Sequence, residues 1–159
     1  MNELRIRDRT LAIVRGDITR IAADAIVRHC PTGSAVVTGA GDLPARWVIH
    51  AVGPVWHGGG TGEAELLVSA YRTSCQLARD LGAGTITFPA ISTGVYCYPM
   101  EQAAGVALTA VRDHLAGETT GETTLERATF VLYSADSLAV FERALSGIRE
   151  GVRRGRRSD

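Results

Sequence analysis

The stretch from Thr85 to Pro99 constrains the fold of this chain more than any other part of its sequence. Residues 86–90 are mostly apolar, which is typical of a buried strand. A short turn rich in Ser, Thr and Gly follows, and Pro99 stands where proline is tolerated, at the start of a helix. A buried strand that leads through a turn into a helix is the building unit of α/β proteins, so this stretch predicts a parallel sheet covered by helices.

The turn between this predicted strand and helix has the chemistry of a phosphate site. Its successive backbone N–H groups, together with the hydroxyls of Ser92 and Thr93, would lie at the positive end of a helix. The chain contains no lysine, which excludes a Gly-x-x-x-x-Gly-Lys-Ser/Thr loop. Backbone amides suit the binding of a diphosphate better than the transfer of a phosphoryl group. The alternative is an ordinary strand–helix turn.

The rest of the chain alternates between strand and helix patterns. Apolar runs predict strands, and apolar stripes of helical period predict helices. In such a sheet, ligands bind outside the carboxyl ends of the strands, where we expect the 92–96 turn and the turn after Tyr133. The predicted strands are residues 4–7, 11–15, 25–27, 35–38, 47–52, 86–90 and 128–133, and the predicted helices are residues 63–81, 99–115 and 136–149.

Length and composition indicate one soluble domain. The chain has 159 residues, of which 45% are apolar and 21% charged, enough for one core. The formal net charge is zero, which argues against a nucleic-acid or membrane surface. We therefore expect one domain over residues 1–150, a monomer, followed by a basic tail over residues 151–159 that is disordered.

The cysteines argue for a reducing compartment. There are three of them, an odd number, and none lies in a Cys-x-x-Cys pair. The His29-Cys30 pair has no second pair at ligand spacing, so no zinc site is expected. The N-terminus has no signal-peptide pattern and no apolar run approaches the length of a membrane helix. These observations predict a cytoplasmic protein without metal or cofactor.

Five motifs, in this order, resemble those of the macrodomain family, and most closely its MacroD-type branch of ADP-ribosyl hydrolases. They cover roughly residues 11 to 145. The resemblance implies a three-layer α/β/α macrodomain-like fold with a mixed, mainly parallel central sheet. The motifs are Arg15-Gly-Asp-Ile-Thr19, Ala23-Asp-Ala-Ile-Val27, Cys30-Pro-Thr-Gly33, Asp42-Leu-Pro-Ala-Arg-Trp-Val-Ile-His-Ala-Val-Gly-Pro54 and Phe88-Pro-Ala-Ile-Ser-Thr-Gly-Val-Tyr96.

The resemblance also implies a role for each residue of an ADP-ribose site. Asp17 would accept a hydrogen bond from the adenine amino group, Ile18 would lie against the purine, and Tyr133 would flank it. The turn would wrap the diphosphate and approach the distal ribose with Ser92, Thr93, Gly94, Val95 and Tyr96. From the residues alone, Asp17 could instead cap a turn and Tyr133 could be an ordinary strand aromatic.

One large piece of the family pattern is absent. After Val27 such proteins continue for about three dozen residues with an asparagine-rich motif, a Gly-rich loop and a helix, whereas here Arg28 follows directly. The catalytic residues expected in that segment, an asparagine and an aspartate, are therefore unknown in this chain. Either the chain is truly shortened, or the segment was not observed and the numbering closes over a gap. We favour the second explanation, because losing a covering helix would expose one sheet face.

The resemblance implies a metal-independent hydrolase. It would remove ADP-ribose from modified acidic side chains of proteins, or acetate from O-acetyl-ADP-ribose, chiefly by positioning a bound water. Its partners would be ADP-ribose and ADP-ribosylated proteins. The first alternative is a reader module that binds ADP-ribose without turnover, which a true truncation would favour. A nucleic-acid-binding role for the arginine-rich tail is a second alternative.

Overall fold

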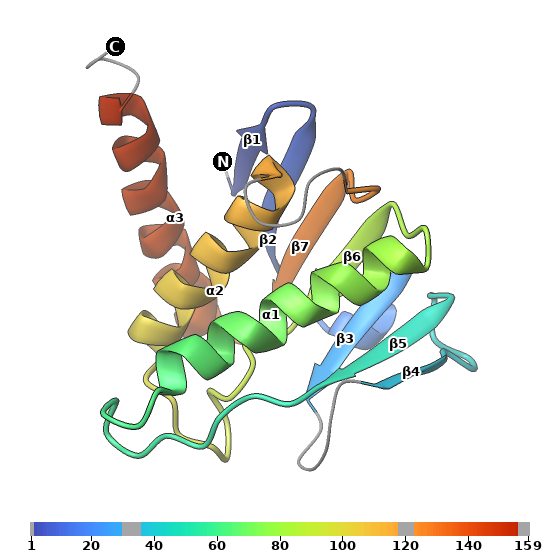
Figure 1. Ribbon diagram of the computed structural model, residues 1–159, viewed down its shortest axis with the longest axis horizontal. Helices are drawn as coiled ribbons and strands as arrows, with labels where there is room; N and C mark the ends of the chain where they lie inside the picture. The colour runs from blue at the N-terminus through green and yellow to red at the C-terminus, as the bar shows by residue number, and fades with distance from the viewer. Residues whose placement is uncertain (1, 30–35, 118–122, 156–159) are drawn as a thin grey trace.

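The computed structural model describes residues 2–29, 36–117 and 123–155. They form a mixed α/β fold around a single seven-stranded sheet (Figure 1). In chain order the elements are β1 (Glu3–Ile6), β2 (Arg9–Arg15), the 3-10 helix η1 (Ile18–Arg20), β3 (Ala25–His29), β4 (Val36–Gly39), β5 (Trp47–Ala51), α1 (Glu63–Asp80), β6 (Thr85–Phe88), α2 (Met100–Ala116), β7 (Arg127–Leu132) and α3 (Ala135–Gly155).

The strands lie in the order β1-β2-β7-β6-β3-β5-β4. The five central strands, from β2 to β5, pair in parallel, whereas β1 and β4 run antiparallel to their neighbours at the two edges. This confirms the predicted mixed, mainly parallel sheet. Because the parallel strands all point the same way, the segments that follow β2, β7, β6, β3 and β5 meet at one edge, here called the carboxyl edge.

The main core lies between one face of the sheet and the three α-helices. The ring of Phe130 on β7 packs against Phe88 of β6, against Tyr71 of α1 and against Phe141 of α3, with centroids 5.3 to 5.6 Å apart. A residue on one strand that touches α1 and α3 places both helices on the same face, and α2 lies between them (Figure 1). Truncating such a buried aromatic to Ala costs about 3–5 kcal/mol, so this cluster is the centre of the fold.

The opposite face carries only η1 and the connection to β3 among the described elements. Gly16 lies between the side chains of Ile21 and Val131, so the connection crosses this face at β7. The second helical layer of the expected three-layer arrangement is reduced to this 3-10 turn within the described residues. Even so, Ile26 and Val48 on the same face are only 1% and 4% exposed, so the expected exposure of a whole apolar face does not occur.

The strand β3 runs through the point at which the family segment is expected. Val27 and Arg28 pair with successive residues of β5, Ile49 and His50, within one uninterrupted strand. Val27 and Arg28 are therefore joined directly in this structure, and the explanation of the missing segment stays a prediction. Ala35, where a strand was predicted to begin, and Cys30 lie outside the described residues.

The C-terminal boundary also differs from the prediction. Helix α3 continues to Gly155, beyond residue 150, where we expected the ordered domain to end. Ile148 packs against the core, and Val152 lies near Leu4 and Ile6 of β1, so the last turns of the helix have apolar neighbours. Only residues 156–159 of the predicted tail lie outside the described part of the chain.

Candidate functional site

Four segments with side chains or amides that could bind a ligand lie at the carboxyl edge. Each of them follows or ends one of four adjacent strands. Asp17 follows β2, Tyr133 follows β7, residues 92–96 follow β6, and His29 ends β3. The first two segments are joined directly, because the Gly16 N–H donates to the Leu132 carbonyl at 2.9 Å. Neighbouring strands lie about 4.8 Å apart, so the line from β2 to β3 spans roughly 14 Å. The edge can thus hold an elongated ligand.

Asp17 is exposed and forms the N-cap of η1. Its Oδ1 accepts from the Thr19 N–H at 2.9 Å and from the Thr19 hydroxyl at 2.6 Å. The Thr19 hydroxyl, and then its backbone N–H, lower the pKa of the Asp17 carboxyl. The capping alternative raised from the sequence is therefore correct. It does not exclude a ligand, because a carboxylate has about four acceptor positions and Thr19 fills two.

The two side chains expected to contact a purine, Ile18 and Tyr133, lie close to Asp17. Ile18 is half-buried at the start of η1. Tyr133 is 84% exposed directly after β7, whereas the Val131 and Leu132 side chains before it are buried. A large aromatic ring left in solvent at the end of a buried strand is free to stack on a flat ligand.

The turn at residues 92–96 is built from strained and tightly packed backbone. Ser92 has φ +67°, and a Cβ placed on Gly53 would come within 2.2 Å of the Ser92 Oγ, so the two segments touch. The buried hydroxyl of Tyr71 donates to the Pro89 carbonyl at 3.0 Å and accepts from the Ile91 N–H at 2.9 Å. These bonds fix the chain just before the turn.

The turn leaves donors available. Thr93 bonds back to Ala90, and the Cys97 N–H donates to the Gly94 carbonyl at 2.9 Å. Within the described residues, the N–H groups of Gly94 and Val95 have no hydrogen-bond partner, and both residues are exposed. Free, exposed amides at successive positions are what a phosphate group needs.

Two side chains at this edge have buried polar atoms without a partner in the described part of the chain. They are the Ser92 hydroxyl and the His29 imidazole, in which both ring nitrogens are covered and unpaired. The His29 ring meets the Tyr96 ring edge to face, with centroids 4.5 Å apart. Burial lowers the pKa of His29, so the ring favours its neutral form. Sequence reasoning considered His29 only as a zinc ligand and missed this position.

A loop after β5 supports the turn from the side. The Trp56 N–H donates to the Tyr96 carbonyl at 2.9 Å, and the Trp56 ring packs on Tyr98. The Glu63 carboxylate, only 1% exposed, accepts from the N–H groups of His57, Gly59 and Thr61 at 2.8 to 3.1 Å. Burial alone would raise the pKa of Glu63, but the backbone N–H groups outweigh it and lower the pKa to about 2. The backbone of this Gly-rich loop is thus anchored by Glu63.

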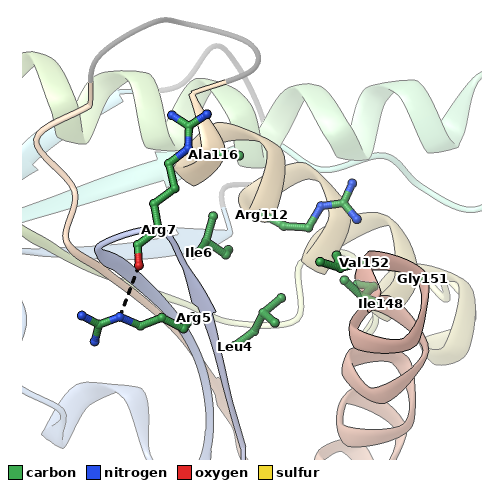
Figure 2. Close-up of a pocket in the computed structure, with 9 residues that line it drawn as sticks. All are labelled: Leu4, Arg5, Ile6, Arg7, Arg112, Ala116, Ile148, Gly151 and Val152. Carbon is green, nitrogen blue, oxygen red and sulfur yellow. Dashed lines mark hydrogen bonds between the residues drawn. The ribbon is translucent and has the colours of Figure 1, made fainter. Parts of the chain in front are cut away.

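Some hollows of the molecule lie away from this edge. One of about 470 Å³ is lined by residues of β1 and by the C-terminal turns of α2 and α3, including Leu4, Arg5, Arg7 and Arg112 (Figure 2). It lies at the opposite end of the strands, because Ile6 pairs with Arg9 at the start of β2. Across the described residues, no three His, Cys, Asp or Glu side chains are grouped to hold a metal ion. No helix there is long and apolar enough to cross a membrane.

The sequence matches the Macro domain family over residues 14–107. A Macro domain-containing protein from Chlorobaculum tepidum is 51% identical over 117 residues, which are 74% of this chain and 66% of that protein. An O-acetyl-ADP-ribose deacetylase from Enterobacter cloacae is 49% identical over 118 residues, 74% of this chain and 63% of that protein. The chain thus matches just under two thirds of the length of these two relatives.

Solved structures share the fold. The Oceanobacillus iheyensis macrodomain solved with ADP has a TM-score of 0.85 and 28% sequence identity, over 94% of this chain and 96% of that one. A mutant of the same macrodomain solved with ADPR has a TM-score of 0.84 and 28% identity, over 93% and 98%. The predicted macrodomain-like fold class is confirmed.

The alignment with one relative also indicates how long the missing segment is. A Macro domain-containing protein from Streptomyces nogalater is 40% identical over 174 positions, which cover 92% of that protein but only 86% of this chain, or about 137 of its residues. About three dozen positions of the relative therefore have no counterpart here, which agrees in size with the segment expected after Val27. The match of the family model to more than half of the chain shows that the chain belongs to the Macro domain family.

Proposed function

We propose that this chain binds ADP-ribose along the carboxyl edge, with the adenine at β2 and β7 and the diphosphate at β6. The arrangement of Asp17, the free amides of Gly94 and Val95, and the exposed Tyr133 on three adjacent strand ends carries the proposal. An accepting carboxylate, a stacking ring and phosphate-binding amides, in this order along the edge, match the parts of an adenosine diphosphate. The ligands named for the Oceanobacillus iheyensis structures agree with it.

The shortened chain favours binding without turnover. The asparagine and aspartate that the resemblance assigns to the ribose end would lie in the absent segment, so these positions have no counterpart to carry the hydrolysis step. We therefore place the reader function ahead of hydrolysis. The acetyl- or protein-ADP-ribose hydrolase remains the second candidate, because relatives 49% and 50% identical to this chain are named O-acetyl-ADP-ribose deacetylases.

Isothermal titration calorimetry with ADP-ribose tests the binding proposal. We expect a 1:1 complex, and at least tenfold weaker binding by Asp17→Ala. Asp17→Ser is the better variant, because Ser caps a helix about as well as Asp but is too short to reach a purine. Asp42→Ala, an exposed aspartate in the loop before β5, is the matched control and should bind normally. Unchanged affinity in both Asp17 variants would remove the adenine assignment.

Turnover is tested separately with O-acetyl-ADP-ribose and with a protein mono-ADP-ribosylated on acidic side chains. The reader function predicts tight binding without release of acetate or ADP-ribose. Release at a rate well above the uncatalysed rate, reduced in parallel with binding in Asp17→Ser, would establish the hydrolase instead.

A further inference from the structure

The hollow of about 470 Å³ between β1 and the last turns of α2 and α3 has no part in the proposed function (Figure 2). It lies at the end of the strands opposite to the carboxyl edge. Its volume falls within the range of about 300–1,000 Å³ that is typical of small-molecule sites. None of the described residues that line it is acidic, and three of them are arginines. The lining thus favours a small anion.

One half of the hollow is apolar. The side chains of Leu4 and Ile6 come from β1 and face Ile148 and Val152 of α3 across the hollow (Figure 2). Val152 is 39% exposed, although it is a large apolar side chain. Removing such surface from water by contact with an apolar chain is favourable. A ligand that fills this half must therefore carry an apolar part as well as a negative charge.

Arg7 supplies a free positive charge. Its guanidinium has no hydrogen bond or ion pair within the described residues. Arg7 has φ +57° at the first position of the two-residue turn that joins Ile6 to Arg9. Glycine is usual at such a position, because a side chain is strained there. The side chain extends toward Ala116 at the end of α2 (Figure 2). An arginine that strains its turn without pairing inside the molecule points to an external anion.

Arg112 supplies a second guanidinium, which is already oriented. Its Nε donates to Oδ1 of Asp113 at 2.7 Å, and Nη2 donates to the same oxygen, whereas Nη1 has no partner in the described part of the chain. An arginine held in this way loses little freedom when it binds a ligand. The carbonyl end of α2 has a cation of its own, because Arg9 donates to the Leu115 carbonyl at 2.7 Å.

We propose that this hollow binds a small amphiphilic anion. A carboxylate or phosphate group is held by Arg7 and Arg112, and a short apolar chain joined to it lies between β1 and α3. Guanidinium groups pair well with both kinds of anion. A nucleic-acid strand would use the arginines but leave the apolar half uncovered, so the small ligand matches the lining better. The site is separate from the carboxyl edge and does not depend on the function proposed above.

Octanoate and octyl phosphate are the two probes, because each joins one of the two anions to a linear apolar chain. Binding is followed through the backbone amide signals of ¹⁵N-labelled protein. We expect saturable shifts at Ile6, Arg7 and Val152. Acetate and octanol should bind at least tenfold more weakly, because each supplies only one half of the ligand. The tighter of the two probes identifies the preferred anion.

Arg7→Gly separates binding from stability. It removes the guanidinium and gives the turn the residue that positive φ favours, so octanoate affinity should fall at least tenfold while the melting temperature stays equal or rises. Arg7→Gln should weaken octanoate to a similar extent. Its matched control is Arg143→Gln, at an exposed arginine of α3 that pairs with Glu101 at 3.2 Å, and it should bind octanoate normally. Val152→Ser, which makes the apolar half polar, should weaken octanoate about threefold.

Three outcomes would overturn the proposal. They are the absence of saturable binding by either probe, shifts confined to the carboxyl edge, and octanoate affinity that is equal in Arg7→Gly and the unaltered protein. A single-stranded oligonucleotide serves as a further probe. If it binds, Arg7→Gln weakens it and neither octanoate nor octyl phosphate binds, the hollow is part of a polyanion surface and the small ligand is excluded.

Discussion

The two ends of the carboxyl edge differ in how completely their polar groups are paired. At the β2 end, Asp17 is held by two hydrogen bonds from Thr19 before any ligand arrives. At the β6–β3 end, Ser92 Oγ and the His29 nitrogens are buried without partners among the described residues. The first end is preorganised for a purine. The second keeps polar groups that have no partner among the described residues, so we expect most of the affinity to come from the first end.

Filling the contact between Gly53 and Ser92 should produce the largest effect. In Gly53→Ala the new Cβ would lie 2.2 Å from Ser92 Oγ and 2.4 Å from the Ile91 Cγ2, so the start of the turn must move. Overpacking of this kind costs about 1–3 kcal/mol of stability. Loss of about two hydrogen bonds to phosphate would weaken ADP and ADP-ribose alike by about 30-fold.

Gly60→Ala is the control for that variant, because a Cβ at Gly60 meets nothing within 4 Å and the residue lies in the loop after β5. Calorimetry and thermal melts should find it close to the unaltered protein. Normal nucleotide affinity in Gly53→Ala would show that the position of Ser92 is unimportant for binding.

The next largest effect is expected at the β2 end of the carboxyl edge, where the purine is proposed to bind. Asp17→Ser should weaken ADP, ADP-ribose and AMP by the same factor of about ten, because all three share the adenine. A ligand-dependent effect of Asp17→Ser would mean that the two ends are not separate.

The smallest effect on binding is expected at Glu63, which acts on the loop beside the turn. Glu63→Gln should lower the melting temperature and weaken ADP-ribose only about two- to threefold, because Gln can accept fewer of the three backbone N–H groups. The contribution of Glu63 to stability should depend on pH in the acidic range. The folded-state pKa of about 2 lies below the ordinary 4.5, so the stabilisation is complete above about pH 4.5 and is lost as the pH falls toward 2.

Thermal melts at a series of pH values between 2 and 5 measure this linkage. The unaltered protein should lose stability more steeply over that window than Glu63→Gln. Parallel curves for the two proteins would contradict the assignment of Glu63 as the anchor of the loop.

Local patterns in the sequence predicted most of the fold. The apolar stripe of residues 63–81 became α1 (Glu63–Asp80), and the Pro99 signal became the start of α2, because these features depend on neighbours a few residues away. The predicted strand 86–90 ends earlier, at Phe88, because Pro89 has no N–H to continue the ladder. The extent of α3 was underestimated, since its last turns depend on contacts with β1 at the other end of the chain.

The sequence predicted site residues only where they lie close together along the chain. Asp17 and residues 92–96 stand in short motifs, so they could be named from the sequence. His29, Gly53 and Glu63 could not, because their importance comes from segments that the sheet brings together from different strands. The one local signal for His29 was its position just after the point where the chain is shortened.

Amide mapping by NMR tests the central claim most directly. ADP-ribose is titrated into ¹⁵N-labelled protein, and the backbone signals are followed residue by residue. A ligand on the carboxyl edge should shift the signals of Thr19, Gly94 and Val95, and leave those of Arg5 and Arg7, beside the hollow in Figure 2, in place. Shifts confined to Arg5, Arg7 and their neighbours, with Gly94 and Val95 unmoved, would contradict the account.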